Sequence, residues 1–159
     1  QGIGTTFTIT LEHKISDTEV NEYPANKQLE KYSLEGKRVL LAEDNDLNAE
    51  IAVTFMENVG MLVDRVVDGR KCIDSLCEHE VGYYDVILMD IQMPVMDGYE
   101  ATKAVRQLED KDLAGIPIVA MTANAFDEDR KAAFAVGMNG HIAKPMNLEK
   151  LKEALADVI

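Results

Sequence analysis

The stretch VILMDIQMPVMDG, residues 86–98, brings a carboxylate to the end of a strongly apolar run. The four residues before Asp90 are apolar without alternation. This predicts a strand that is covered on both faces, as strands are in parallel sheets. Met93-Pro94 follows shortly afterwards and predicts a turn. An acid at the end of such a strand reaches water only at the edge of the sheet, so the neighbouring strand ends decide what Asp90 meets there.

Four other apolar segments have the length of strands: residues 39–42, 62–67, 117–121 and 140–143. Apolar residues at helical spacing, or a capping residue, predict a helix after each strand. These helices are expected near residues 51–59, 71–79, 101–108, 127–136 and 148–158. The alternation predicts an α/β fold with a doubly wound, five-stranded parallel sheet in the order 2-1-3-4-5. A site in such a sheet lies at the carboxyl ends of the strands, where the order reverses between strands 1 and 3.

Polar residues follow four of the five predicted strands. Glu43 and Asp44 come after the first, Asp90 after the third, Thr122 after the fourth and Lys144 after the fifth. Three carboxylates that share a site repel one another unless a cation intervenes, and ligands that are all oxygen favour Mg²⁺. Asp90 can act as a carboxylate nucleophile towards phosphorus, while the lysine and the hydroxyl hold phosphoryl oxygens. This set predicts Mg²⁺-dependent phosphoryl transfer to Asp90.

Each of these residues also has an ordinary structural interpretation. Residues 44–46 are typical of a helix N-cap, Asp90 of a turn before a proline, Thr122 of a cap, and Lys144 of a surface charge. Four separate strand ends nevertheless carry the residue types that one reaction needs. The joint occurrence therefore favours the functional interpretation.

The segments VLLAEDNDLN, VILMDIQMPVMDG, IVAMTANA and HIAKPMN together resemble the receiver domain of two-component response regulators, which is flavodoxin-like. The resemblance covers about residues 36–159. It implies that Asp90 is the phosphoacceptor and that Asp44 binds Mg²⁺ directly, whereas Glu43 acts largely through water. The backbone carbonyl of Gln92 would complete the metal ligands of the protein.

The same resemblance assigns a conformational switch. Thr122 matches the switch hydroxyl of the family and Lys144 its invariant lysine. His141 occupies the aromatic switch position, where the family more often has Tyr or Phe. A packed or hydrogen-bonded surface histidine is the alternative for His141. In the functional interpretation, Thr122 and His141 report phosphorylation to the last strand and its flanking helices.

The first residues have a different texture. GIGTTFTITL, residues 2–11, resembles the last glycine box and final strand of a histidine-kinase ATP-binding domain. We expect residues 1–14 to be a remnant of that domain and residues 15–35 to be a linker. The chain is then a fragment of a hybrid sensor histidine kinase, without the parts that bind ATP, and is not itself a kinase. His13 follows the strand and is not expected to be a phosphodonor.

Two other classes of protein share part of this residue pattern. A haloacid-dehalogenase-like phosphatase also uses a strand-end Asp with Mg²⁺, but it needs a second Asp two residues later, where this chain has Gln92. A dinucleotide-binding module needs a glycine-rich turn after the first strand, where this chain has acids. Gln92 and Asn124 are neutral amides that supply no general base, so a phosphoryl group on Asp90 is expected to persist.

Composition limits the partners. A formal net charge of −13 disfavours nucleic acid and anionic lipid, and no apolar run is long enough to span a bilayer. Cys72 and Cys77 lack metal-ligand spacing and predict reduced thiols and a cytoplasmic domain, whose parent kinase can be membrane-anchored. The resemblance implies a histidine-kinase donor domain and a histidine phosphotransfer domain as the next carrier. The sequence leaves a homodimer through the last two helices open.

Overall fold

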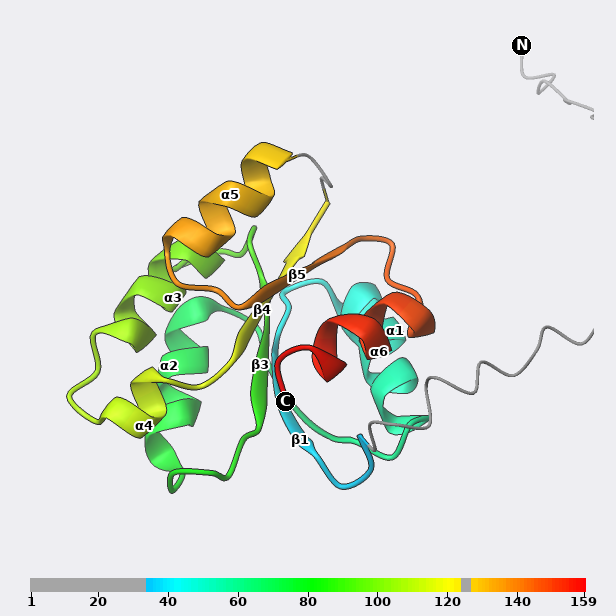
Figure 1. Ribbon diagram of the computed structural model, residues 1–159, viewed down its shortest axis with the longest axis horizontal. Coiled ribbons are helices and arrows are strands. Elements are labelled where there is room, and N and C mark those ends of the chain that lie inside the picture. Colours follow the sequence, from blue (N-terminus) through cyan, green and yellow to red (C-terminus); the bar gives the residue numbers. More distant parts are fainter. Residues whose placement is uncertain (1–33, 124–126) are drawn as a thin grey trace, which may run out of the picture. The chain divides into compact units, whose positions relative to one another are not determined.

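The computed structural model describes residues 34–123 and 127–159, which form one layered α/β unit (Figure 1). The predicted kinase remnant, nearly all of the predicted linker, and Asn124 lie outside the described residues. The elements in chain order are β1 (Arg38–Ala42), α1 (Asp46–Glu57), β2 (Leu62–Val66), α2 (Gly69–Glu78), β3 (Val86–Asp90), α3 (Gly98–Arg106), α4 (Lys111–Ala114), β4 (Ile118–Thr122), α5 (Asp127–Ala135), β5 (Gly140–Ala143) and α6 (Leu148–Ala156).

The five strands form one sheet in the order β2-β1-β3-β4-β5, and every neighbouring pair is parallel. This confirms the predicted fold class and strand order. The central strand β3 pairs with β1 on one side and with β4 on the other. The order reverses between β1 and β3, so the chain leaves these two strands towards opposite faces of the sheet.

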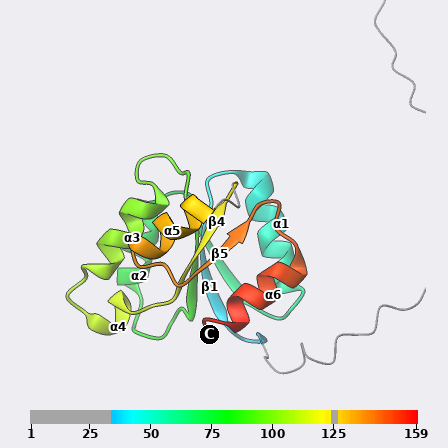
Figure 2. The same cartoon turned by 45° about the horizontal axis from the view of Figure 1, so that its top comes forward.

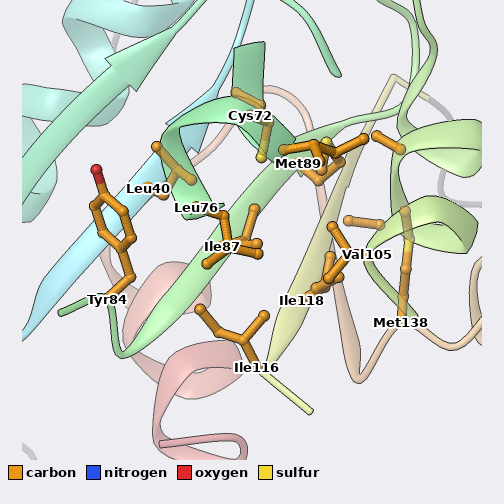
Figure 3. Packing of buried hydrophobic residues seen from close by; sticks show 14 of the residues in the cluster. Leu40, Cys72, Leu76, Tyr84, Ile87, Met89, Val105, Ile116, Ile118 and Met138 are labelled. Atoms are coloured by element: carbon orange, nitrogen blue, oxygen red, sulfur yellow. The ribbon is translucent and has the colours of Figure 1, made fainter. Parts of the chain in front are cut away.

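Side chains of β3 alternate between two cores. Ile87 and Met89 pack with α2 and α3 on one face, as Figure 3 shows, while Val86 and Leu88 pack with α1 and α6 on the other. Figures 1 and 2 show α1 and α6 together on one side of the sheet and α2, α3 and α5 on the other. Because both faces are covered, the run before Asp90 needs no polar residue.

Strands β3 and β4 end at Asp90 and Thr122, the residues that were predicted to stand at the ends of these strands, and the structure adds one short helix. The third predicted helix ends at Arg106, before Leu108. The four-residue helix α4 was not predicted, because a single turn is too short to show a helical period.

The described region begins within the core. Leu34 is buried beside α1, two residues before the predicted start of the receiver.

In the part of the chain that the structure describes, no helix combines the length and the apolarity that a membrane span requires.

Gly98, the first residue of α3, packs closely against the end of β3. A Cβ atom at this position would lie 2.3 Å from the backbone oxygen of Asp90. We expect Gly98→Ala to lower the free energy of unfolding by at least ~2 kcal/mol, because backbone atoms cannot move aside as a side chain can. Urea denaturation measures this change.

Gly140→Ala is the matched control, because its nearest neighbour would be a Val119 methyl group at 3.5 Å, an ordinary contact. It should change the stability by less than about 1 kcal/mol. Equal stability of the Gly98→Ala variant and the wild type would contradict this close packing.

Candidate functional site

A cavity of about 420 Å³ opens at the carboxyl ends of β1, β3 and β4. Six residues that were predicted for the site contribute to its lining: Glu43, Asp44, Asp90, Gln92, Thr122 and Lys144. They come from four separate strand ends, as expected for the switch point of a doubly wound sheet. The structure therefore brings together the residues that the sequence interpretation grouped.

The alternation of the strands explains why three of these side chains meet. Glu43 and Lys144 continue the sheet ladders one residue beyond β1 and β5, because their backbone amides donate to Val66 and Thr122. Counting by two from the buried residues of each strand places Glu43, Asp90 and Lys144 on the face of α1 and α6. The same count places Thr122 on the opposite face.

Lys144 bridges two buried carboxylates. Its Nζ donates to Glu43 Oε2 at 2.6 Å and to Asp90 Oδ2 at 2.7 Å. The Glu43 and Asp90 residues are 1% and 5% exposed, so both charges are largely removed from water. A buried charge is tolerated when it is paired and hydrogen-bonded, and this ammonium pairs with both acids at once.

The second oxygen of Glu43 is held by the start of α1. Asn48 Nδ2 donates to Glu43 Oε1 at 3.1 Å, and the Asn45 amide donates to the same atom at 3.3 Å. Asn45 is also the N-cap of α1, because its side chain accepts from the Asn48 amide. The N-cap interpretation of this segment is therefore confirmed, and the same residues also line the acidic cavity.

Asp90 is held at both oxygens, by Lys144 at Oδ2 and by the Gln92 amide, 3.2 Å from Oδ1. Burial raises the pKa of the Asp90 carboxyl, the charge of Glu43 adds to this effect, and the hydrogen bonds from Lys144 and Gln92 act against it. Burial acts to lower the pKa of Lys144, but its hydrogen bonds to Asp90 and Glu43 outweigh burial and raise it. Lys144 therefore stays a cation in the site.

Three acids can converge on one cation here. One carboxylate oxygen from each of Glu43, Asp44 and Asp90 lies within 4.8 Å of the other two. Mg²⁺ binds oxygen at about 2.1 Å, so opposite ligands lie about 4.2 Å apart. Three carboxylates and one ammonium leave two negative charges, which a divalent cation balances. The donors and the charge of this site fit Mg²⁺.

Three further residues that line the cavity were not predicted from the strand ends. Asn48, Tyr99 and Asp129 also line it, from the first turns of α1, α3 and α5. Only Asn48 had a sequence signal, since it stands three residues after an N-cap. Tyr99 and Asp129 follow longer connections, and no sequence motif there predicts that their side chains line the cavity.

His141 lies on β5, opposite Ala120 of β4, and lines a different cavity between α5 and α6. It is not among the residues that line the acidic cavity. Thr122, which lines the acidic cavity, is linked to the end of β5 through its backbone oxygen, which accepts from the Lys144 amide at 2.7 Å.

The bridging lysine leads to a stability prediction. Lys144→Ala leaves Glu43 and Asp90 buried without a shared counter-ion, so we expect a loss of ~3 kcal/mol in metal-free unfolding free energy. Lys150→Ala, at an exposed position of α6, is the control and should change stability by less than ~0.5 kcal/mol. Equal losses for the two variants in urea denaturation would refute the bridge.

Comparison with known proteins agrees with this geometry. A family model described as the response regulator receiver domain matches residues 39–156. The peroxide stress-activated histidine kinase mak1 of Schizosaccharomyces pombe is 34% identical over 141 residues, which cover 87% of this chain and 9% of that protein. This chain therefore spans about a tenth of the length of that relative.

Solved structures give the same family. The chemotaxis protein CheY4 of Vibrio cholerae matches with a TM-score of 0.70 and 30% identity, over 78% of this chain and 99% of that one. The receiver domain of the sensor histidine kinase PA1611 of Pseudomonas aeruginosa PAO1, solved with magnesium in its active-site cleft, matches with a TM-score of 0.68 and 37% identity, over 77% and 97% of the two chains.

These matches do not support the haloacid-dehalogenase-like phosphatase that the sequence left as an alternative. The family model covers most of the chain and includes all four strand ends that line the acidic cavity. The chain therefore belongs to the response regulator receiver domain family, and its residues 39–156 are a receiver domain of two-component signalling.

Proposed function

We propose that this receiver domain accepts a phosphoryl group from a phosphohistidine on the Asp90 carboxylate, in a Mg²⁺-dependent reaction that switches its output surface. One observation carries the proposal: the Lys144 ammonium joins the buried carboxylates of Asp90 and Glu43 beside an exposed Asp44. A nucleophile, a cation for phosphoryl oxygens and an acidic pair for a metal are thus within one cavity. The magnesium in the cleft of the PA1611 receiver supports the choice of ion.

The residues divide the chemistry between them. An Asp90 oxygen bonds to phosphorus while the bond from phosphorus to the histidine nitrogen breaks, and the imidazole leaves. Lys144 is already hydrogen-bonded to Asp90, so its ammonium can follow the new phosphoryl oxygens. The Thr122 hydroxyl would donate to another phosphoryl oxygen.

The metal ligands are proposed from the same residues. Asp44, Asp90 and the backbone carbonyl of Gln92 would bind Mg²⁺ directly, and Glu43 would act through water. When bound, the ion offsets the negative charge of the carboxylates and the phosphoryl oxygens. Direct binding by Asp44 is supported by its exposure, while Glu43 already has hydrogen bonds at both oxygens.

Thr122 and His141 are proposed as the switch. Thr122 ends β4, and its neighbour across the ladder, Ala143, follows His141 by two residues on β5. A change at Thr122 therefore has a short route to the cavity between α5 and α6, where His141 lies. We propose that this surface carries the output, including a homodimer through α5 and α6.

The proposed partners are a histidine-kinase donor domain and a histidine phosphotransfer domain. The match to mak1 supports a parent histidine kinase, and it covers more of the chain than residues 36–159 alone. This extent supports the linker proposed for residues 15–35, whereas the kinase remnant proposed for residues 1–14 rests on the resemblance of GIGTTFTITL to a histidine-kinase ATP-binding domain. Free Cys72 and Cys77 support a reducing, cytoplasmic setting, and the net charge of −13 favours a protein partner over nucleic acid.

The acceptor is tested by intact mass after incubation with Mg²⁺ and acetyl phosphate. Wild type should gain one phosphoryl group, and Asp90→Asn should gain none because the amide is not a nucleophile of this kind. Asp97→Asn is the matched control, since an Asn still caps α3, and it should be labelled like the wild type. Labelling of the Asp90→Asn protein at the wild-type rate would refute the assignment.

The metal ligands are tested by calorimetric titration with Mg²⁺. Asp44→Asn should weaken binding more than ~tenfold, because a direct carboxylate ligand is lost. Glu43→Gln should weaken it less, since Glu43 is expected to act through water. The charge-matched control, Asp157→Asn at the far end of α6, should bind as the wild type does. Equal affinity of Asp44→Asn and the wild type would contradict the ligand set.

A further inference from the structure

Arg65 of β2 holds the loop that carries the acidic pair. Its Nε donates to the backbone oxygen of Glu43 at 3.1 Å, and its Nη2 donates to that of Asp44 at 3.3 Å. Its Nη1 pairs with Asp46 Oδ1 at 2.8 Å. One guanidinium therefore contacts three residues of the segment that leaves β1 and begins α1.

The two carbonyl contacts matter more than the ion pair. The Asp46 side chain is 93% exposed, and a pair with such an exposed acid contributes little. The carbonyl oxygens belong to the peptide units on either side of Asp44. Those units set the direction of the Asp44 side chain and of the Asn45 amide, which donates to Glu43 Oε1. Arg65 thus fixes the backbone between the two acids.

The contacts of Arg65 with the two carbonyl oxygens oppose the repulsion among the three acids. Glu43, Asp44 and Asp90 converge within 4.8 Å, and without a cation their repulsion drives exposed Asp44 away from the other two. Among the described residues, Lys144 pairs with Glu43 and Asp90 and forms no ion pair with Asp44. Arg65 is the cation that holds Asp44, through its backbone, at the place where three oxygens can share one ion.

We propose that Arg65 is a positioning residue that pre-organises the acidic loop for a divalent cation. This inference rests on the proposed function of the same site. The guanidinium is planar and forked, so it reaches both carbonyl oxygens at once, which an ammonium cannot do. The positive charge of Arg65 by itself weakens Mg²⁺ binding, because it repels the ion, whereas its hold on the loop strengthens binding. The two effects therefore predict opposite results when Arg65 is replaced.

The test compares Arg65→Ala, Arg65→Lys and the wild type by calorimetric titration with Mg²⁺ alone. Loss of the anchor should weaken binding roughly tenfold in Arg65→Ala, as for other residues that orient metal ligands. Arg65→Lys should restore only a small part of the lost Mg²⁺ affinity, because lysine returns the charge but not the forked guanidinium that reaches both carbonyl oxygens. Arg38→Ala removes the same charge from the first residue of β1, where Arg38 pairs with Asp64 and not with the acidic loop, and should bind as the wild type does.

A second readout needs no metal. Amide hydrogen exchange at Glu43 and Asn45, whose amides donate to Val66 and to Glu43 Oε1, should be faster in both Arg65 variants but unchanged in Arg38→Ala. Tighter or unchanged Mg²⁺ binding in Arg65→Ala, or full restoration by Arg65→Lys, would overturn the positioning role while the proposed function stands. Absence of Mg²⁺ binding by the wild type would overturn both.

Discussion

The site depends on one ammonium between two buried carboxylates. Lys144 follows β5 and contacts Asp90 at the end of β3 and Glu43 just beyond β1, and each acid can be buried because this cation pairs with it. The sheet order is what makes the contact possible, since the ends of β1, β3, β4 and β5 must all open into one cavity. The contacts of Lys144 therefore depend directly on the order of the strands in the sheet.

The strand ends were predictable from sequence because buried parallel strands are continuous apolar runs. The runs before Glu43, Asp90 and Thr122 identified the sheet, and its order then brought the polar residues together. The helix α4 was not predictable, because one turn has no period to detect. The route of the chain around the sheet thus follows from patterns that extend over many residues.

Side-chain contacts were predicted less well than positions. The direct bond between Lys144 and Glu43, the support of Glu43 by Asn48, and the anchor of Arg65 depend on rotamers and on the pairing of β2 with β1. Sequence spacing contains no information on these directions. His141 illustrates the same limit, because its strand was predicted, whereas the sequence carries no sign of the cavity between α5 and α6 that it lines.

The role of Asp90 is tested most directly by identifying the phosphorylated residue. Borohydride reduction of the phosphorylated protein converts an aspartyl phosphate to homoserine, and peptide mass spectrometry then locates the changed residue. We predict homoserine at position 90, formed only when Mg²⁺ was present during phosphorylation. Homoserine at Asp44 or another acid, or a phosphoryl group that resists reduction, would contradict the central role of Asp90.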